Sequence, residues 1–453
     1  MPMTKIQNAK LDGIEEVLQE EFERNKAPVN QDAIRNILDA NDGARIRTWL
    51  GICSRCGLCA ESCFVYLANG RNPKLSPAYK FKHTLGEMYR RKGKIDRTFL
   101  ENSFRISWLQ CTMCKRCALF CPFGIDIATM ISISRNICHS QGFKPHSLHE
   151  FSEHCRRSGN HMGIPQEELI DTCEWMAEEA EDDYRGVEIP VDRQNVKFMY
   201  TINPREPVYY PQDISYAGII LSAAGESWTI PSFGWDCTNL PMFCGDRNLA
   251  GQQVKNVYQK ALELGAEKIL ITECGHAYRS MAFEGPYMAG YEGGRPPVEI
   301  VHFVRLIYEY LRDGRLKIDP TKKIKEPVTY QDPCNVSRNG GLWEEARKII
   351  PYLAEDFRDM SPNRDHNHCC GGGGGIMPMG PKYKPVRMAS GRVKAEQIKA
   401  TGAKIVIAPC HNCFDQIHDL GQEYDLGLKV LSFKEIIVEA MIVPDHMKLA
   451  ENA

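Results

Sequence analysis

The motif CSRCGLCAESC at residues 53–63 returns as CTMCKRCALFC at residues 111–121, directly followed by Pro122. Both copies have the spacing C-x2-C-x2-C-x3-C. Two residues between ligands let three thiolates of one tight loop reach three corners of an iron–sulfur cubane, so the fourth corner needs a cysteine from elsewhere. The pair of motifs therefore predicts a helical domain that holds two [4Fe-4S] cubane clusters.

The terminal proline resembles that of bacterial two-cluster ferredoxins, in which the fourth cysteine of a motif ligates the other cluster. This likeness implies exchanged ligands between the two motifs. Zinc is the alternative metal, but a zinc ion uses two C-x2-C pairs and leaves the third cysteine and the duplication unexplained. We expect one cluster on Cys53, Cys56, Cys59 and Cys121, and the second on Cys111, Cys114, Cys117 and Cys63.

The composition of the 453 residues is that of a globular protein, with 43% apolar and 25% charged residues. The formal net charge of −2 lacks the basic excess that nucleic-acid binding requires. No segment approaches 18 apolar residues, and residues 1–10 have no apolar signal core. We therefore expect a cytoplasmic protein, in which 19 cysteines predict metal or redox chemistry rather than disulfides.

The chain changes character near residue 190, after the acidic run 178–183. Before it, the pattern predicts two amphipathic helices in 1–45, built on Leu11, Ile14, Leu18 and Phe22 and then on Ile34, Ile37 and Leu38 with Asn30 and Asp32 as caps. Residues 46–190 form the helical domain with the two motifs. After it, strands expected at 196–201, 268–272, 328–331, 404–408 and 430–433 alternate with helices, which predicts α/β units.

The α/β part repeats itself. The segment GAEKILITEC, residues 265–274, reappears one residue shorter as GAKIVIAPC, residues 402–410. Each copy reads as a helix end, a buried strand and a cysteine. Two copies favour a pseudo-twofold pair of lobes, at 191–320 and 321–453, whose strand ends bring their cysteines toward one cleft. The fold class is thus α+β and α/β, a helical ferredoxin-like domain followed by two pseudo-symmetric cysteine-rich lobes.

A second cysteine constellation lies in the second lobe, in the form C-x34-CC-x39-C-x2-C. Five thiolates exceed the needs of one cubane, and adjacent residues in extended chain point to opposite sides. We therefore expect a third cluster, non-cubane or site-differentiated, with an iron or sulfur open to substrate. The glycines at 371–375 let backbone close around it, and they do not fit a nucleotide motif. Its predicted ligands are Cys334, Cys369, Cys370, Cys410 and Cys413.

These motifs together resemble a known family. A two-cluster domain ending in CPFGIDI at 121–127, followed by paired lobes with Cys369-Cys370-Gly371, is similar to the catalytic D subunit of heterodisulfide reductase. The segment TECGHAY at 272–278 and the length look closest to cytoplasmic iron–sulfur subunits of sulfate-reducer membrane complexes, of the sulfite-reductase-associated and high-molecular-weight or tetrahaem cytochrome types.

The resemblance implies an oxidoreductase that reduces a disulfide at the third cluster, with Cys369 and Cys370 as catalytic residues. It implies a membrane cytochrome b-like subunit and a multihaem cytochrome c as partners, which would hold the protein at the inner face of the cytoplasmic membrane. The other partner would be a disulfide-bearing small protein or cofactor.

The first lobe departs from the family pattern, because Phe243 stands at a paired-cysteine position and Ala277 at the second position of C-x2-C. We expect it to hold no cluster of its own and to present Cys274 or His276 to the second lobe. His276 is the predicted catalytic proton donor, since its ordinary pKa lies near neutrality, and Glu273 is a weaker candidate.

Two other functions stay open. One is a pure electron relay without disulfide chemistry, and the other is the iron–sulfur subunit of a glycolate- or lactate-type dehydrogenase that works with a flavoprotein. The basic segment 74–94 lies between the two motifs, near the expected electron entry. It is either a solvated helix face or a contact with the membrane partner or anionic lipid.

Overall fold

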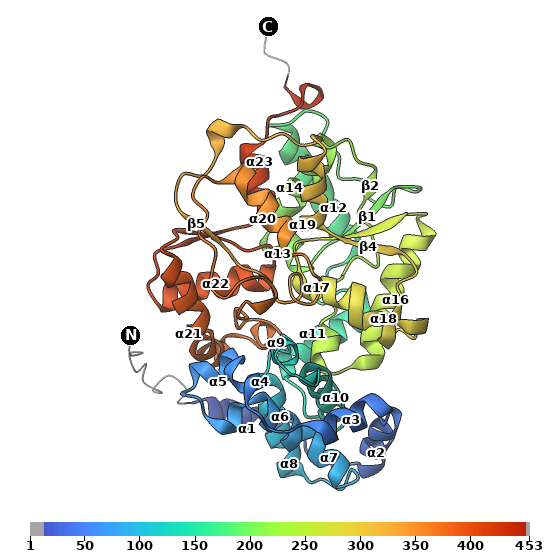
Figure 1. Cartoon of the computed structure of the whole chain (residues 1–453). Coiled ribbons are helices and arrows are strands. Elements are labelled where there is room, and N and C mark those ends of the chain that lie inside the picture. The colour runs from blue at the N-terminus through green and yellow to red at the C-terminus, as the bar shows by residue number, and fades with distance from the viewer. Residues whose placement is uncertain (1–12, 450–453) are drawn as a thin grey trace. The chain divides into compact units, whose positions relative to one another are not determined.

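The computed structural model describes residues 13–449, which form two compact units (Figure 1). Among the described residues, the first unit comprises 13–149, 243–246 and 368–395, and the second comprises 150–242, 247–367 and 396–449. Two short segments of the cysteine-rich lobes thus pack with the N-terminal helices. The domain boundaries that we predict at residues 45, 190 and 320 come from the sequence alone and stay predictions.

The first unit is helical, and its N-terminal helices follow the expected pattern. Leu18 and Phe22 are buried on α1, and Ile34 and Leu38 on α2, whose N-cap Asn30 accepts a hydrogen bond from the Ala33 N–H at 3.0 Å. Leu11 lies outside the described residues. The helices are α1 (Ile14–Glu23), α2 (Gln31–Ala40), α3 (Ala44–Ile52), α4 (Leu58–Glu61), α5 (Phe64–Ala68), α6 (Pro77–Phe81), α7 (Glu87–Arg90), α8 (Arg97–Phe104), α9 (Arg116–Leu119) and α10 (Ile127–Ser140).

Helices α11 (His146–Ser158) and α12 (Gln166–Glu181) lead to the first lobe of the second unit. Its sheet is parallel, in the order β2-β1-β3-β4. The strands read as nearly continuous apolar runs because both faces are covered. The elements are β1 (Phe198–Thr201), α13 (Arg205–Tyr209), α14 (Gln212–Ala223), β2 (Trp228–Thr229), α15 (Leu240–Cys244), α16 (Arg247–Glu263), β3 (Lys268–Ile271), α17 (Gly275–Arg279), α18 (Gly285–Met288), β4 (Glu299–His302) and α19 (Phe303–Arg312).

The second lobe has a smaller parallel sheet, in the order β5-β6-β7. The predicted repeat is present: Gly265 after α16 and Gly402 after α21 are both left-handed, at φ +64° and +65°, and β3 and β6 each lead to a cysteine that caps a helix. The elements are β5 (Val328–Tyr330), α20 (Glu344–Leu353), α21 (Lys384–Thr401), β6 (Ile405–Ile407), α22 (His411–Glu423), β7 (Lys429–Leu431) and α23 (Phe433–Ala440).

Helices are paired reciprocally between the two lobes. Helix α14, which follows the first strand of lobe one, packs on α23, which follows the last strand of lobe two. In the same way α20, after the first strand of lobe two, packs on α19, after the last strand of lobe one. Buried side chains of both lobes, such as Tyr200, Phe303, Tyr330 and Phe433, form one continuous core. The two lobes are therefore related by a pseudo-twofold axis, as the repeat predicts.

All five predicted strands exist, each one or two residues shorter than expected, while β2 and β4 were not predicted. Within residues 13–449, no helix has the length and apolar character needed to cross a membrane.

Candidate iron–sulfur and substrate sites

The two C-x2-C-x2-C loops have the same backbone. The second residue after the first cysteine is left-handed in both, at Arg55 (φ 58°) and Met113 (φ 54°). The fourth is also left-handed, at Gly57 (φ 88°) and Lys115 (φ 63°), and it is the N-cap of a short helix, α4 or α9. Non-glycine residues rarely adopt this conformation, so the loops are held in a specific shape that turns successive side chains inward.

The eight cysteines of the motifs line two separate cavities of the first unit. One has Cys53, Cys56 and Cys59 in its wall together with Cys121 from the other motif. The other has Cys111, Cys114 and Cys117 together with Cys63. Each cavity thus has three thiols from one loop and the fourth from the other loop, a grouping that is consistent with exchanged ligands.

The thiols of each cavity disfavour one another's ionisation. Burial, together with the neighbouring Cys53, Cys121 and Cys56, raises the pKa of Cys59 to about 11. Burial, Cys114, Cys111 and Cys63 raise the pKa of Cys117 in the same way. Four crowded thiolates need a cationic centre to balance them. The donor set of each cavity therefore fits an iron–sulfur cluster.

Lys80 lies against the second cavity and not at the surface. Its side chain is 2% exposed, and Nζ lies 3.7 Å from Cys63 Sγ and 2.5 Å from the Gln110 carbonyl oxygen. Within the basic segment 74–94, Arg90 and Arg91 are exposed and both pair with Glu87. Lys80, a residue of this segment, therefore belongs neither to a solvated face nor to a docking contact, because its ammonium group is buried beside Cys63 and Gln110.

Cys369 and Cys370 belong to the first unit and are 2% and 3% exposed. The Cys369 Sγ lies 3.4 Å from Thr112 Oγ1, next in sequence to Cys111. The glycine run is required here, since a Cβ on the left-handed Gly374 would come 2.6 Å from the Thr112 carbonyl oxygen. The Cys-Cys pair thus packs directly on the second cysteine loop.

Arg135 of α10 fixes this arrangement. Its fully buried guanidinium donates hydrogen bonds to the carbonyl oxygens of Ser107, Cys111, Phe243 and Gly374, at 2.6 to 3.1 Å. These oxygens belong to three segments that are distant in sequence. No sequence pattern indicated this role, because an arginine on a helix is ordinarily exposed.

Cys334, Cys410 and Cys413, the other three predicted ligands of the third cluster, belong to the second unit. Cys410 caps α22 and accepts a hydrogen bond from the Gly275 N–H at 3.4 Å. A hydrogen bond from Cys413 lowers the pKa of Cys410 to about 6. A thiolate at this helix N-terminus is suited to metal ligation.

The first lobe carries an arginine at the position that corresponds to Cys334, a predicted ligand in the second lobe. Arg205 is the fourth residue after β1, as Cys334 is the fourth after β5. Its Nη1 lies 2.5 Å from Asp415 Oδ2, and the Tyr210 hydroxyl donates to the same carboxylate at 2.6 Å. This substitution was missed in the sequence, although the matching N-P-R and D-P-C segments at 203–205 and 332–334 could have revealed it.

Other cysteines of the second unit are buried. Cys237 and Cys274 in the first lobe are 0% exposed, and burial together with Cys274 raises the pKa of Cys237. Cys155 and Cys173 of this unit, like Cys138 of the first unit, lie singly on helices and are at most 3% exposed. They are core residues.

His276, the predicted proton donor, lies near the pseudo-twofold axis. It is 2% exposed, and its Nδ1 lies 2.8 Å from the Asn412 side-chain amide nitrogen. Asn412 is the equivalent residue of the second lobe. His276 thus links the two lobes, and it is not among the residues that line the cavity beside Cys410.

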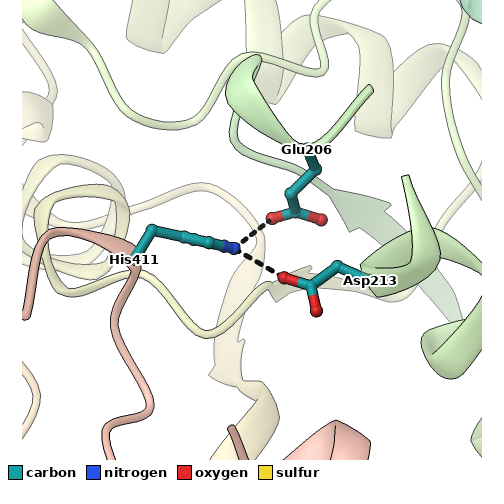
Figure 2. A group of neighbouring side chains, drawn as sticks. All are labelled: Glu206, Asp213 and His411. Atoms are coloured by element: carbon teal, nitrogen blue, oxygen red, sulfur yellow. Dashed lines mark hydrogen bonds and ion pairs between the residues drawn. The ribbon is translucent and has the colours of Figure 1, made fainter. Parts of the chain in front are cut away.

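Glu206, Asp213 and His411 meet between the lobes (Figure 2). His411 Nε2 lies 2.7 Å from Asp213 Oδ2 and 3.6 Å from Glu206 Oε1. Although burial lowers it, the hydrogen bond to Asp213 raises the pKa of His411 to about 10. The fully buried Lys434 ammonium lies 3.6 Å from Asp213 and 3.9 Å from Glu206. Two cations thus balance two carboxylates, and the group is a charge network and not a metal site.

Comparisons with known proteins agree with the two kinds of site. A family model described as a 4Fe-4S dicluster domain matches residues 49–125, and one described as a cysteine-rich domain matches residues 328–418.

Similar curated proteins span most of the chain. The Hdr-like menaquinol oxidoreductase iron–sulfur subunit of Archaeoglobus profundus is 24% identical over 84% of this chain and 76% of its own length. The D subunit of the dihydromethanophenazine:CoB–CoM heterodisulfide reductase of Methanosarcina mazei is 24% identical over 86% of this chain and 94% of its own length. The EtfAB:quinone oxidoreductase of Syntrophomonas wolfei is 24% identical over 86% of this chain and 58% of its own length.

Proposed function

We propose that this chain, a heterodisulfide reductase D-like iron–sulfur protein, carries electrons between a membrane redox module and a disulfide. That it is an iron–sulfur electron-transfer oxidoreductase follows from its two matched domains and its relatives. The membrane module, the disulfide and the direction of flow are the proposal. The observation that carries it is the sorting of eight cysteines into two four-thiol cavities, one of which adjoins the Cys-Cys pair.

An iron–sulfur cluster, when bound, takes up and passes on one electron at a time. The chain provides two sets of four thiols to hold such clusters, Cys53, Cys56, Cys59 and Cys121 in one cavity and Cys111, Cys114, Cys117 and Cys63 in the other.

The first cavity is the better entry point for electrons. Cys56 of this cavity is exposed. Three large apolar residues close in sequence to its cysteines are also exposed: Ile52 (42%), Leu58 (51%) and Phe123 (43%). A cluster of exposed apolar side chains is typical of a surface that another protein covers. We propose that a redox partner docks here. On the family resemblance given in the sequence analysis, it would be a cytochrome b-like subunit linked to a multihaem cytochrome c at the inner membrane face.

The second cavity is the better exit point. Thr112, the residue after Cys111 in the loop of this cavity, has its Oγ1 3.4 Å from the Sγ of Cys369. The proposed route therefore runs from the first cavity to the second and then to the Cys-Cys pair. There Cys369 and Cys370, with Cys334, Cys410 and Cys413, would hold the third, non-cubane or site-differentiated cluster at which the disulfide is cleaved. The setting that we propose is a sulfate-reducer membrane complex of the sulfite-reductase-associated, high-molecular-weight cytochrome or tetrahaem cytochrome type.

The test is reduction of the cluster-loaded full chain with dithionite-reduced methyl viologen, followed by addition of a disulfide. We expect that the reduced viologen gives up two electrons for each disulfide consumed and that free thiols appear. Electron paramagnetic resonance of the same samples should show reduced clusters. Clusters that accept electrons while no disulfide is consumed would contradict the disulfide chemistry.

A pure electron relay is the second candidate, and one observation favours it. Arg205 occupies a ligand position of the first lobe, so this lobe lacks the set for a second substrate-binding cluster. A relay would reduce a protein acceptor without producing thiols, which the same experiment detects.

A further inference from the structure

A cavity of about 130 Å³ opens beside Cys410, between the two lobes of the second unit. Three aromatic side chains, Tyr210, Tyr216 and Phe414, line it together with the carboxyl groups of Glu273 and Glu435. Such a cavity, mostly apolar with a few convergent polar groups, has the character of a small-molecule site. The sequence did not reveal it, because its walls come from five separate elements.

Glu273 is the unusual group of this cavity. It is 2% exposed; Oε1 accepts a hydrogen bond from the Phe433 N–H at 3.3 Å, and Oε2 has no hydrogen-bond partner in residues 13–449. A buried carboxyl oxygen without a partner is costly, and it is found where function requires it. Burial raises the pKa of Glu273 to about 7, although Lys434 opposes the shift. Glu273 can therefore exchange a proton near neutral pH.

The charges around Glu273 leave no spare cation among the described residues. Lys434 on α23, Asp213 on α14, His411 on α22 and Tyr330 on β5 interact with Glu273. Cys410 and Glu435 share the wall of the cavity, and Glu206 on α13 and Tyr200 on β1 lie beside Lys434. Asp213 and Glu206 balance His411 and Lys434, as described above. Glu435 remains, and burial raises its pKa too. The wall is thus neutral to negative.

We propose that this cavity holds one arm of the disulfide substrate, that Glu273 donates a proton to the thiolate released there, and that the acidic wall selects uncharged or cationic arms. This rests on the proposed disulfide reduction. In the reaction the S–S bond breaks, two electrons arrive from the external donor through the cysteine-bound clusters, and two protons form two S–H bonds. Glu273 gives one proton and regains it from water, and the second thiolate takes its proton from water.

The substrate selection follows from the same wall. An anionic arm would approach Glu435 in a cavity of low polarity, where like charges repel strongly. A cationic arm would instead gain from the three aromatic faces. We expect kcat/KM to rank cystamine and 2-hydroxyethyl disulfide above 3,3′-dithiodipropionate by about tenfold or more.

The test uses the cluster-loaded full chain, reduced methyl viologen and these three disulfides between pH 5.5 and 9. Glu273→Gln should lower kcat by about a hundredfold or more and remove the limb of the pH profile near 7. Glu273→Asp should restore part of the rate, with a displaced limb. Glu267→Gln, an exposed glutamate just before β3, is the matched control and should leave rate and profile unchanged.

The infrared band of the protonated Glu273 carboxyl group provides a readout that is independent of turnover. A carboxyl band that titrates near pH 7 should be present in the wild-type protein and absent in Glu273→Gln. Equal iron content in all variants shows intact folding. If Glu273→Gln keeps the wild-type rate and pH profile, or the anionic disulfide is preferred, this inference is overturned while disulfide reduction stands. If the wild-type protein reduces none of the three although its clusters accept electrons, both the inference and the proposed function fall.

Discussion

Replacing Arg135 by Met should unfold the junction that holds the Cys-Cys pair on the second cysteine loop. The guanidinium satisfies four buried carbonyl oxygens, of Ser107, Cys111, Phe243 and Gly374. All four oxygens lose the guanidinium donor, but the Phe243 oxygen keeps the Trp108 indole N–H at 3.0 Å, so only the other three losses are counted. A buried polar group left without a partner costs about 1 to 3 kcal/mol, so the variant should lose about 3 kcal/mol at the least.

The assay is urea unfolding followed by tryptophan fluorescence, since Trp108 lies under the guanidinium, 5.1 Å from its central carbon. Arg156→Met is the control, because Arg156 is 52% exposed and its 3.4 Å contact with Glu153 is a surface ion pair worth about 0 to 1 kcal/mol. Arg135→Lys should fall between the two, as an ammonium has fewer donors. A loss below about 1 kcal/mol in Arg135→Met would refute the reasoning.

Three further predictions concern the cysteines and the basic segment. Cys121→Ser should damage the cluster of the first cavity and spare the cluster held by Cys111, Cys114 and Cys117, which lie near Cys121 in sequence. Electron paramagnetic resonance spectra and iron analysis of the variant would detect this loss. Loss of the second cluster instead would contradict the exchange of ligands. Cys370→Ser should abolish disulfide reduction while the two ferredoxin-type clusters still accept electrons from dithionite, and retained thiol production would exclude the Cys-Cys pair from the reaction. Reversing the charges of the exposed Arg90, Arg91 and Lys92 should release the protein from membranes at low salt if the segment docks there, whereas unchanged sedimentation with vesicles would make it an ordinary solvated surface.

The arrangement of the two cysteine cavities could be anticipated because the ligands of a cluster follow from short, local spacings. The same holds for β3 and β6, whose apolar runs are buried on both faces. By contrast, β2 has two residues, too few for a periodic pattern, and β4 begins with Glu299, whose carboxylate pairs with Lys268 of β3 at 2.9 Å. Because a charged residue near Pro297 is typical of a loop, the sequence alone does not indicate a strand here without knowledge of the pairing with Lys268.

The functional surroundings could not be predicted, because they depend on which distant residues meet. Lys80 belongs to a basic run, yet it is buried beside Cys63. His276 and Glu273 are three residues apart, and only the fold shows that Glu273 lines the cavity while His276 contacts Asn412. The periodicity of a helix or strand says which face is inside, but not which partner lies there.

The reciprocal helix pairing between the lobes has a consequence for how such a duplicated protein can change. Because α14 covers α23 and α19 covers α20, neither copy of the repeat has a complete core by itself. A cut between α19 and β5 would leave each half with an uncovered apolar helix. A single copy of the repeat would therefore need a second copy to cover these helices, either in a symmetric homodimer or in a fused pair such as this chain.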